Sequence, residues 1–392
     1  MPELMKHEIL LGDCLEVLRG LPDNSVDSVV TDPPYGLAFM GKKWDYDVPS
    51  VQVWQEVLRV LKPGGHALVA CGTRTQHRMA VNLEDAGFEI RDIVAWVYGS
   101  GFPKSLNVGK SVDKLQGNER EVVGEKPYSN MNIKGKAGYI VNEGKNRVQL
   151  SESRGTSEWE GWGTALKPAM ELWTLCRKPL SEKNVAENCL KWGVGGINID
   201  ACRVDGVPPS VPQPLIRPKG IDSGHALGAG TGRNGEMSKA PGRFPANLIH
   251  DGSDEVVGLF PETNKSTASK RGANRNGDVY GEYGLCDTIR GHNDNGGSAS
   301  RFFYCAKASK SERGEGNNHP TVKPVKLMKY LITLITPKNG IVLEPFGGSG
   351  TTAVACVETG NPFIIIEREP EYIEIIKKRV QANKTKPDLF NA

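Results

Sequence analysis

Apolar residues follow strand-like and helix-like spacing in turn at both ends of this chain. Near the N-terminus, the β-branched run 26–30 is typical of a buried strand, and 51–61 has its apolar residues on one helical face. Pro63-Gly64-Gly65 is expected to stop that helix. The N-terminal part thus predicts strands at 7–13, 25–32, 66–71 and 88–98, separated by helices at 14–21, 51–61 and 75–86.

The C-terminal part repeats this alternation. Its pattern predicts helices at 324–335, 351–360 and 370–383, with strands at 340–345 and 362–367. Strands that alternate with helices form a mostly parallel sheet, which here predicts a doubly wound, Rossmann-like α/β fold. Neither end has enough strands for such a sheet alone. We therefore expect both ends to join in one sheet.

The middle of the chain lacks this regular pattern. Between residues 101 and 310 we find only short strand-like pieces, at 171–180, 244–251 and 301–307, separated by polar loops rich in glycine. No internal repeat is found. The sequence therefore predicts a sheet domain made of 1–100 and 311–392, with 101–310 inserted between its two parts.

Composition is that of an ordinary globular protein. Of the 392 residues, 38% are hydrophobic and 24% charged, and no apolar run approaches the roughly 20 residues needed to cross a bilayer. The N-terminal residues do not resemble a secretory signal. The eight cysteines are scattered without CxxC or zinc-like spacing, so no metal site is expected and a reducing cytoplasm is the natural location.

Positive charge is concentrated in the middle region. The whole chain has a net charge of +3, but 101–310 contains 29 Lys and Arg against 23 Asp and Glu. Basic, glycine-rich loops suit a surface that binds an anionic polymer, although a solvated linker has the same composition. Charge alone does not decide between these two interpretations.

The sequence TDPPYG, residues 31–36, ends the predicted strand 25–32 in an unusual way. Asp32 precedes a proline and is therefore held at extended angles. Pro33 and Pro34 have fixed φ and no N–H, so this segment cannot continue as a strand partner and its carbonyls are available to a ligand. Tyr35 adds an aromatic face directly after them.

A second motif, EPFGGSGTT at 344–352, follows a predicted strand and opens a predicted helix. Glycines there allow close approach of a ligand to the backbone, and a helix N-terminus favours an acidic group. Glu367 ends the next strand, 20 residues after Gly347, where an acid can accept hydrogen bonds from ribose hydroxyls. The loop also fits a dinucleotide fingerprint, but too little chain follows Glu367 for a second mononucleotide half.

In this order, the motifs resemble those of the S-adenosylmethionine-dependent amino-methyltransferases of DNA. The resemblance rests on GDC at 12–14, TDPPYG at 31–36, HPTVKP at 319–324, EPFGGSGTT at 344–352 and the acid Glu367. Catalytic motif first and cofactor glycines last is the circularly permuted arrangement called the beta class. It implies a catalytic part at 1–100, a target-recognition region at 101–310, a cofactor-binding part at 311–392, and double-stranded DNA as the partner.

The resemblance also implies a mechanism for the TDPPYG segment. An exocyclic amine is a poor nucleophile because its lone pair is delocalised into the ring, and two acceptors can draw the nitrogen toward tetrahedral geometry. Asp32 and the Pro33 carbonyl would be these acceptors, Pro34 would keep the loop rigid, and Tyr35 would stack on a base flipped out of the duplex.

The cofactor is assigned to the remaining motif residues in the same way. The glycine loop would hold the methionine part, Glu367 the ribose, and Asp13 with Cys14 the adenine. Asp13 has an alternative role as a helix N-cap, and Lys323 as a surface lysine at a helix start. The full expected cofactor set is Asp13, Cys14, Asp32, His319, Thr321, Lys323, Glu344, Phe346, Gly347, Gly348, Ser349, Gly350, Thr351, Thr352 and Glu367.

Three residues just past the catalytic loop are candidate DNA contacts. Lys42 and Lys43 can hold phosphates, and Trp44 can line a base pocket. A solvated loop with one packed tryptophan is the alternative interpretation.

The predicted function is transfer of a methyl group to N6 of adenine in a specific DNA sequence. Cytosine N4 is the first alternative, since it presents a similar amine; Asp32 favours adenine because the cytosine-N4 relatives more often have Ser there. A related Asn-Pro-Pro-Tyr motif serves RNA and protein-glutamine methyltransferases. A DNA-binding protein that retains the fold without activity is a rival of another class. A homodimer and a cognate restriction endonuclease are partners that the resemblance leaves open.

Overall fold

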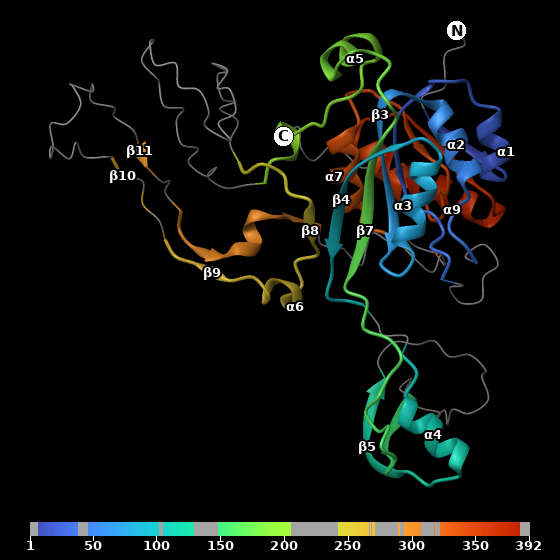
Figure 1. Cartoon of the computed structure of the whole chain (residues 1–392), viewed down its shortest axis with the longest axis vertical. Helices are drawn as coiled ribbons and strands as arrows, with labels where there is room; N and C mark the ends of the chain where they lie inside the picture. The colour runs from blue at the N-terminus through green and yellow to red at the C-terminus, as the bar shows by residue number, and fades with distance from the viewer. Residues whose placement is uncertain are drawn as a thin grey trace, which may run out of the picture. The chain divides into compact units, whose positions relative to one another are not determined.

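We describe the protein from a computed structural model (Figure 1). The structure describes residues 7–37, 46–101, 105–128, 148–204, 242–265, 267, 269–270, 289–290, 294–306, 317 and 322–384. Two compact units are present, one formed by 1–99 with 170–392 and the other by 100–169.

A nine-stranded sheet is the centre of the larger unit, in the order β1-β15-β14-β2-β3-β7-β4-β8-β13. All neighbouring pairs are parallel except those of β7, which runs antiparallel to β3 and to β4. The strands are β1 His7–Leu11, β2 Val26–Thr31, β3 Leu61–Gly72, β4 Glu89–Val97, β7 Met170–Arg177, β8 Leu248–His250, β13 Tyr304–Cys305, β14 Val342–Glu344 and β15 Phe363–Glu367.

Helices bury the two faces of this sheet in separate cores. Alternate residues of β15 point to opposite faces, so Phe363 and Ile365 join one core while Ile364 and Ile366 join the other. The first core includes α7, α8 and α9, and the second includes α1, α2 and α3. Their bounds are α1 Cys14–Arg19, α2 Val51–Val60, α3 Gln76–Asp85, α7 Val325–Ile335, α8 Thr351–Thr359 and α9 Pro370–Lys384.

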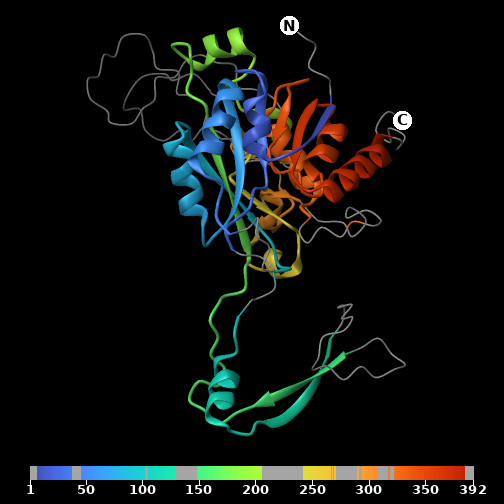
Figure 2. The same cartoon turned by 90° about the vertical axis from the view of Figure 1, so that its right-hand side faces the viewer.

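The two ends of the chain meet in this sheet, as the alternating pattern predicted. β1 pairs with β15 and β2 pairs with β14, so the blue N-terminal and red C-terminal segments lie side by side in Figure 2. The expected doubly wound, mostly parallel sheet is therefore confirmed, and the predicted strands and helices of both ends are present.

The predicted start of one strand is wrong: it was expected at His66, whereas the end of the preceding helix lies within one residue of its predicted end. The helix α2 ends at Val60, and β3 begins at Leu61 and runs through Pro63-Gly64-Gly65. Pairing with β2 shifts register here, since Val26 pairs with Leu61 but Ser28 pairs with His66. The Pro-Gly-Gly stretch therefore lies within the irregular first part of β3 and not between the helix and the strand.

The middle region differs from the expected single insertion at 101–310. The strand-like pieces predicted there form β7, β8 and β13, and all three belong to the central sheet. β7 lies between β3 and β4, with nearly every residue paired on both sides. The larger unit also contains α5 Val185–Trp192, η3 Asp200–Cys202, α6 Asp254–Val257, β9 Glu262–Thr263, β10 Ser269–Lys270, β11 Ile289–Arg290, β12 Gly297–Ser298 and η4 Ala299–Phe302.

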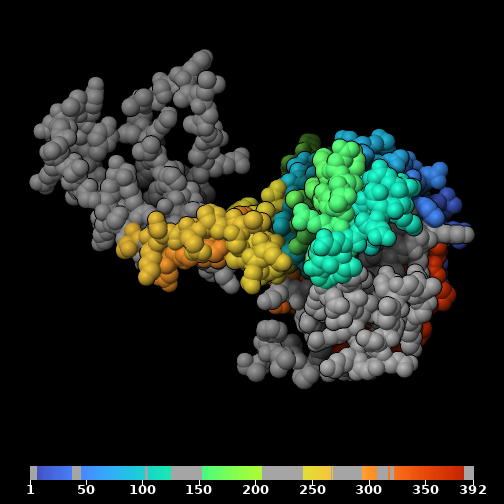
Figure 3. Space-filling view, turned by 90° about the horizontal axis from the view of Figure 1, so that it is seen from below, coloured from blue at the N-terminus to red at the C-terminus, as the bar shows by residue number. Residues whose placement is uncertain are grey.

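The described residues of the smaller unit, 100–169, form one helix and one antiparallel strand pair. They are α4 Val108–Gln116, β5 Glu121–Tyr128 and β6 Val148–Arg154. Arg120 binds Asp113 of α4 and, at 2.9 Å, Glu160, so one guanidinium links the helix to the segment after the strand pair. The surface of this unit, in cyan and light green in Figure 3, exposes Trp162 and Leu166. The sequence pattern had not indicated α4.

The described residues contain neither a candidate membrane span nor a candidate metal-ligating cluster, and their cysteines are not paired. None of the helices in these parts of the chain is long and apolar enough to cross a bilayer. The seven cysteines in the same parts are all free thiols. No group of three or more candidate metal-ligating side chains is found in the segments that the structure describes.

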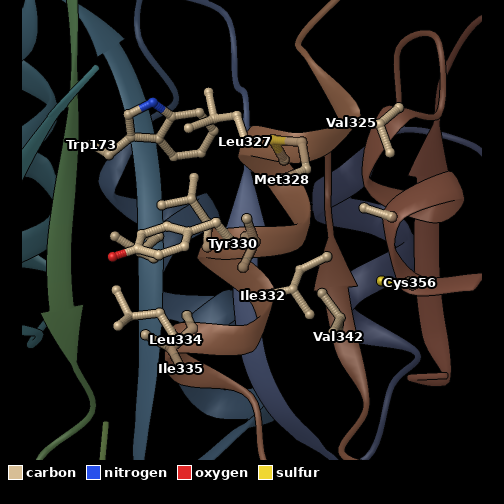
Figure 4. Packing of buried hydrophobic residues seen from close by; sticks show 14 of the residues in the cluster. Trp173, Val325, Leu327, Met328, Tyr330, Ile332, Leu334, Ile335, Val342 and Cys356 are labelled. Carbon is tan, nitrogen blue, oxygen red and sulfur yellow. The ribbon is translucent and has the colours of Figure 1, made fainter. Parts of the chain in front are cut away.

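The packing of α7 in the core can be tested by shortening one of its buried side chains. Leu327 lies against Trp173 and has no exposed surface (Figure 4), whereas Leu190 of α5 is 89% exposed. We expect Leu327→Ala to reduce the free energy of unfolding by about 2–5 kcal/mol, because it leaves a cavity. The matched control Leu190→Ala should change it by less than about 0.5 kcal/mol. Urea unfolding followed by tryptophan fluorescence measures both, and equal losses would contradict this packing.

Candidate active site

Four neighbouring parallel strands, β1, β15, β14 and β2, end at one edge of the sheet. The predicted motif residues follow the ends of these strands: Asp13 after β1, Glu367 at the end of β15, the glycine loop after β14 and Asp32 after β2. Parallel strands place their carboxyl ends at the same edge, which is where open α/β sheets bind ligands. The site is therefore assembled from segments more than 300 residues apart.

Tyr35 and Asp32 form a hydrogen-bonded unit within the loop 31–36, which is expected to be catalytic and is called the catalytic loop below. The Tyr35 hydroxyl donates to Asp32 Oδ1 at 2.7 Å. The Tyr35 ring packs against Gly72 at the end of β3, where a Cβ would lie 3.3 Å from Tyr35 Cδ2. Burial, followed by the nearby Asp32 and Glu171 carboxylates, raises the pKa of Tyr35. The phenol is therefore held neutral, and its ring is fixed beside the Asp32 carboxylate.

Lys323 lies between two carboxylates. Its Nζ is 3.0 Å from Asp32 Oδ2, 3.0 Å from Glu171 Oε2 and 3.1 Å from the Tyr35 hydroxyl. Burial lowers the pKa of Lys323, but Asp32 and Glu171 raise it by more, so the net shift is upward and the ammonium is retained. The expected role of Lys323 in binding the cofactor carboxylate stays a prediction, whereas its place beside Asp32 is a property of this structure.

Glu171 was not predicted as a site residue. It is the second residue of β7, opposite Gly72 on β3 and Trp96 on β4. Burial raises the pKa of Glu171, and Lys323 opposes that rise. Burial and the nearby Glu171 carboxylate also raise the pKa of Tyr98 to about 12. In the sequence, Glu171 is recognisable only as an acid at the start of the apolar run 171–176. The pairing of β7 with β3 is what brings this acid near Asp32.

Glu344 joins the catalytic loop to the glycine loop. Thr31, directly before Asp32, donates to Glu344 Oε1, and Thr352 of α8 donates to Oε2 at 2.8 Å. The Phe346 amide also donates to Oε1, at 3.0 Å. Burial nevertheless raises the pKa of Glu344 to about 8. Glu344 thus holds the ends of β2 and β14 together, and at neutral pH its carboxyl is largely protonated.

The glycine loop between β14 and α8 is closely packed. Gly350 has φ +77°, and a Cβ there would lie 2.9 Å from the Ile376 side chain of α9. A Cβ on Gly347 would lie 2.6 Å from Ile365. Arg379, which the sequence had not indicated, donates from α9 to the Ser349 carbonyl at 2.6 Å. Larger side chains are therefore excluded, and α9 fixes the loop from behind.

Glu367 binds the same loop. It accepts from the Gly348 amide at 2.6 Å and from the Glu369 amide at 2.8 Å. Burial raises the pKa of Glu367, while these two amides lower it. The acid is thus anchored beside the glycine loop, as its position in the sequence indicated.

Asp13 acts as the N-cap of α1. Its Oδ1 accepts from the Leu15 amide at 2.9 Å, which is the alternative role considered for it. The preceding Gly12 amide donates to the Glu367 carbonyl at 3.0 Å, so Asp13 and Cys14 lie next to the end of β15. Burial, with Asp13 as a smaller cause, raises the pKa of the Cys14 thiol to about 12.

Five predicted site residues lie outside the described part of the chain. They are His319 and Thr321 of the HPTVKP motif, and the candidate DNA contacts Lys42, Lys43 and Trp44.

Solved structures of DNA methyltransferases are similar to this chain at low identity. The crystal structure of an M1.HpyAVI-SAM complex is 18% identical, with a TM-score of 0.40, covering 95% of this chain and 98% of that one. The PvuII DNA methyltransferase (cytosine-N4-specific) is 15% identical, with a TM-score of 0.44, covering 95% and 86%.

Curated relatives match over short stretches. The type II methyltransferase M2.LlaDCHI of Lactococcus lactis subsp. cremoris is 35% identical over 91 residues, 23% of this chain and 34% of that protein. The DNA adenine methyltransferase YhdJ of Escherichia coli (strain K12) is 42% identical over 66 residues, 17% and 22%. The chain thus spans about a third or less of these two relatives. M.SfiI of Streptomyces fimbriatus matches 93% of this chain and 89% of its own length at 22% identity.

A family model covers nearly the whole sheet-forming part of the chain. It describes the N6 and N4 methyltransferases under the heading DNA methylase, and it matches residues 26–378, from β2 to α9. This range includes the catalytic loop, the glycine loop and Glu367. Because the match extends over more than half of the sequence, the protein belongs to the DNA methylase family of N6 and N4 methyltransferases.

Proposed function

We propose that this protein transfers a methyl group from S-adenosylmethionine to N6 of an adenine flipped out of a specific DNA sequence. The observation that supports the proposal is the pairing of β2 with β14, in which Ser28 and Val29 lie opposite Val342 and Leu343. It brings Thr31 and the following Asp32 next to Glu344, directly before the glycine loop 346–350. A methyl donor at one loop would then face an amine held at the other.

The residues of the sheet edge suit S-adenosylmethionine, which supplies an activated methyl group on a sulfonium when bound. The Glu367 carboxylate accepts backbone amide bonds that fix its position, and its remaining lone pairs can accept a ribose hydroxyl. Asp13 and Cys14, next to the end of β15, are placed to contact the adenine. The glycine loop, where larger side chains are excluded, would hold the methionine part.

Asp32 would prepare the acceptor amine. One Asp32 oxygen receives the Tyr35 hydroxyl and the other receives Lys323, and each oxygen retains a lone pair for an amine N–H. The Pro33 carbonyl would accept the other N–H, and the Tyr35 ring would stack on the flipped base. The intact Asp32 cluster and the closely packed Gly350 favour an active enzyme over a DNA-binding protein that has lost activity.

The target sequence would be read by segments of the middle region. Its described residues outside the central sheet strands belong to the unit 100–169 and to the stretches 178–204, 242–247 and 251–303 with their gaps. We retain the role of 101–310 in target recognition as part of the proposal, with β7, β8 and β13 assigned to the sheet. Lys42, Lys43 and Trp44 remain proposed contacts to DNA.

The cofactor assignment is tested at Glu367. Because Glu367→Ala removes the acceptor proposed for the ribose hydroxyls, we expect affinity for S-adenosylmethionine to fall about tenfold or more. The matched control Glu374→Ala, on the exposed side of α9, should bind as the natural protein does. Isothermal titration calorimetry measures both. Binding of NAD in place of S-adenosylmethionine would remove the cofactor from the proposal.

Catalysis is tested at Asp32. We expect Asp32→Ala to abolish methyl transfer, because the amine loses its charged acceptor, while cofactor affinity stays within about tenfold. Asp85→Ala, at an exposed position of α3, is the matched control and should retain full activity. Transfer of tritium from labelled cofactor to DNA gives the rates. Undiminished turnover by Asp32→Ala would exclude the proposed mechanism.

The choice of adenine is tested by the product. After reaction with labelled cofactor and digestion of the DNA, we expect the label in N6-methyladenine. A duplex with 2-aminopurine at the target position should become more fluorescent on binding, as the base leaves its stack. Label in N4-methylcytosine would show that the target base is cytosine, and the proposed role of Asp32 in holding the amine would be unchanged.

A further inference from the structure

In the cluster of Asp32, Lys323 and Glu171, two carboxylates share one ammonium, although one carboxylate would be enough to neutralise it. The Lys323 ammonium lies 3.0 Å from each carboxylate, and the Lys323 side chain is 9% exposed. Asp32 and Glu171 are 24% and 16% exposed. With both carboxylates ionised, two carboxylates and one ammonium give the described cluster one net negative charge.

Stability alone does not explain Glu171. Removing a carboxylate from water is costly, and a lysine already paired with Asp32 would satisfy the charges of a neutral site. Glu171 shares Lys323 with Asp32 instead of making a separate pair. The Glu171 carboxylate also has an electrostatic effect, because it keeps the net charge around Asp32 negative.

Methyl transfer is a reaction that a negative charge at this position would assist. The lone pair of the amine nitrogen forms the new C–N bond, and the electrons of the broken S–C bond remain on sulfur as a neutral thioether. One positive charge thus moves from sulfur to the nitrogen held by Asp32, until a proton leaves that nitrogen through Asp32 to water. A negative environment around Asp32 stabilises this change, whereas a neutral Asp32–Lys323 pair would do so less.

We propose that Glu171 is a positioning residue that holds Lys323 and keeps the Asp32 cluster at one net negative charge as positive charge develops on the amine. This inference rests on the proposed function, in which Asp32 holds the acceptor. In it, Lys323 is the counter-ion that Asp32 and Glu171 share, and the Tyr35 hydroxyl orients Asp32 through Oδ1.

The test restores the charge with a second substitution. Glu171→Gln makes the cluster neutral, and we expect the single-turnover rate at saturating cofactor to fall roughly 10- to 100-fold. Glu171→Gln with Lys323→Met returns the net charge to that of Asp32 alone. This double variant should be at least about fivefold faster than Glu171→Gln. A purely structural role predicts instead that the second substitution adds to the loss, and that result would overturn the proposal.

Glu171→Asp and Glu89→Gln complete the design. Glu171→Asp retains the charge and should be faster than Glu171→Gln; equal rates in these two variants would overturn the proposal even if one of them were less stable. Glu89 pairs with Arg177 at the opposite end of β7, so Glu89→Gln should leave the rate unchanged. Thermal unfolding and cofactor titration of every variant separate folding and KM effects from the rate of transfer.

Failure of this inference is distinguishable from failure of the proposed function. If the natural protein transfers no methyl group to DNA, the proposed function is wrong and Glu171 has no role in it. If the natural protein is active and Glu171→Gln matches its rate within about twofold, the function stands and only the role of Glu171 is wrong.

Discussion

The parallel pairing of β2 with β14 is the interaction on which the rest of this structure depends. It joins segments of the chain more than 300 residues apart, and it is supported beyond the strand pairs themselves. Ser28 Oγ and Thr336 Oγ1 are 2.8 Å apart, and the Ile341 amide donates to Asp27 at 2.7 Å. A buried polar group needs such partners, so these side chains specify the register of this pair. Without this register, the catalytic loop and the glycine loop would not face each other.

The same pairing concentrates acidic groups at one edge of the sheet. Asp32, Glu171, Glu344 and Glu367 lie around the strand ends, and they are stabilised in different ways. Glu344 is buried with a pKa near 8 and is largely neutral, Glu367 is anchored by backbone amides, and Asp32 shares Lys323 with Glu171. Environments that separate the protonation of neighbouring acids are typical of functional sites. This edge suits a ligand that carries positive charge.

The antiparallel strand β7 comes from the middle region and contributes a residue to the Asp32 cluster. It enters the sheet between β3 and β4, and its second residue, Glu171, reaches Lys323. The segments immediately before β7 belong to the unit 100–169, so the chain passes from that unit directly into the Asp32 cluster. A region proposed to read DNA is thus continuous in sequence with a strand that contributes to the proposed active site.

The sequence by itself determined the regular elements and the motif residues of the two chain ends. Buried β-branched runs and amphipathic stretches are local patterns, and Asp32, Gly350 and Glu367 follow their strands at recognisable spacings. Residues whose role depends on long-range contacts were not recognisable in this way. Glu171 and Arg379 belong to elements with ordinary composition, and β3 begins at Leu61, which pairs with Val26 of β2, and not at the predicted His66.

Only the tertiary structure decided which charges meet. The sequence predicted Lys323 as a cofactor ligand or a surface lysine; the tertiary structure places its buried ammonium between Asp32 and Glu171, and the cofactor role stays a prediction. The sequence also predicted one insertion at 101–310, yet β7, β8 and β13 from that region complete the sheet. The physical reason is that side-chain periodicity reports burial within one element, whereas pairing partners, shared counter-ions and pKa shifts arise from residues distant in sequence.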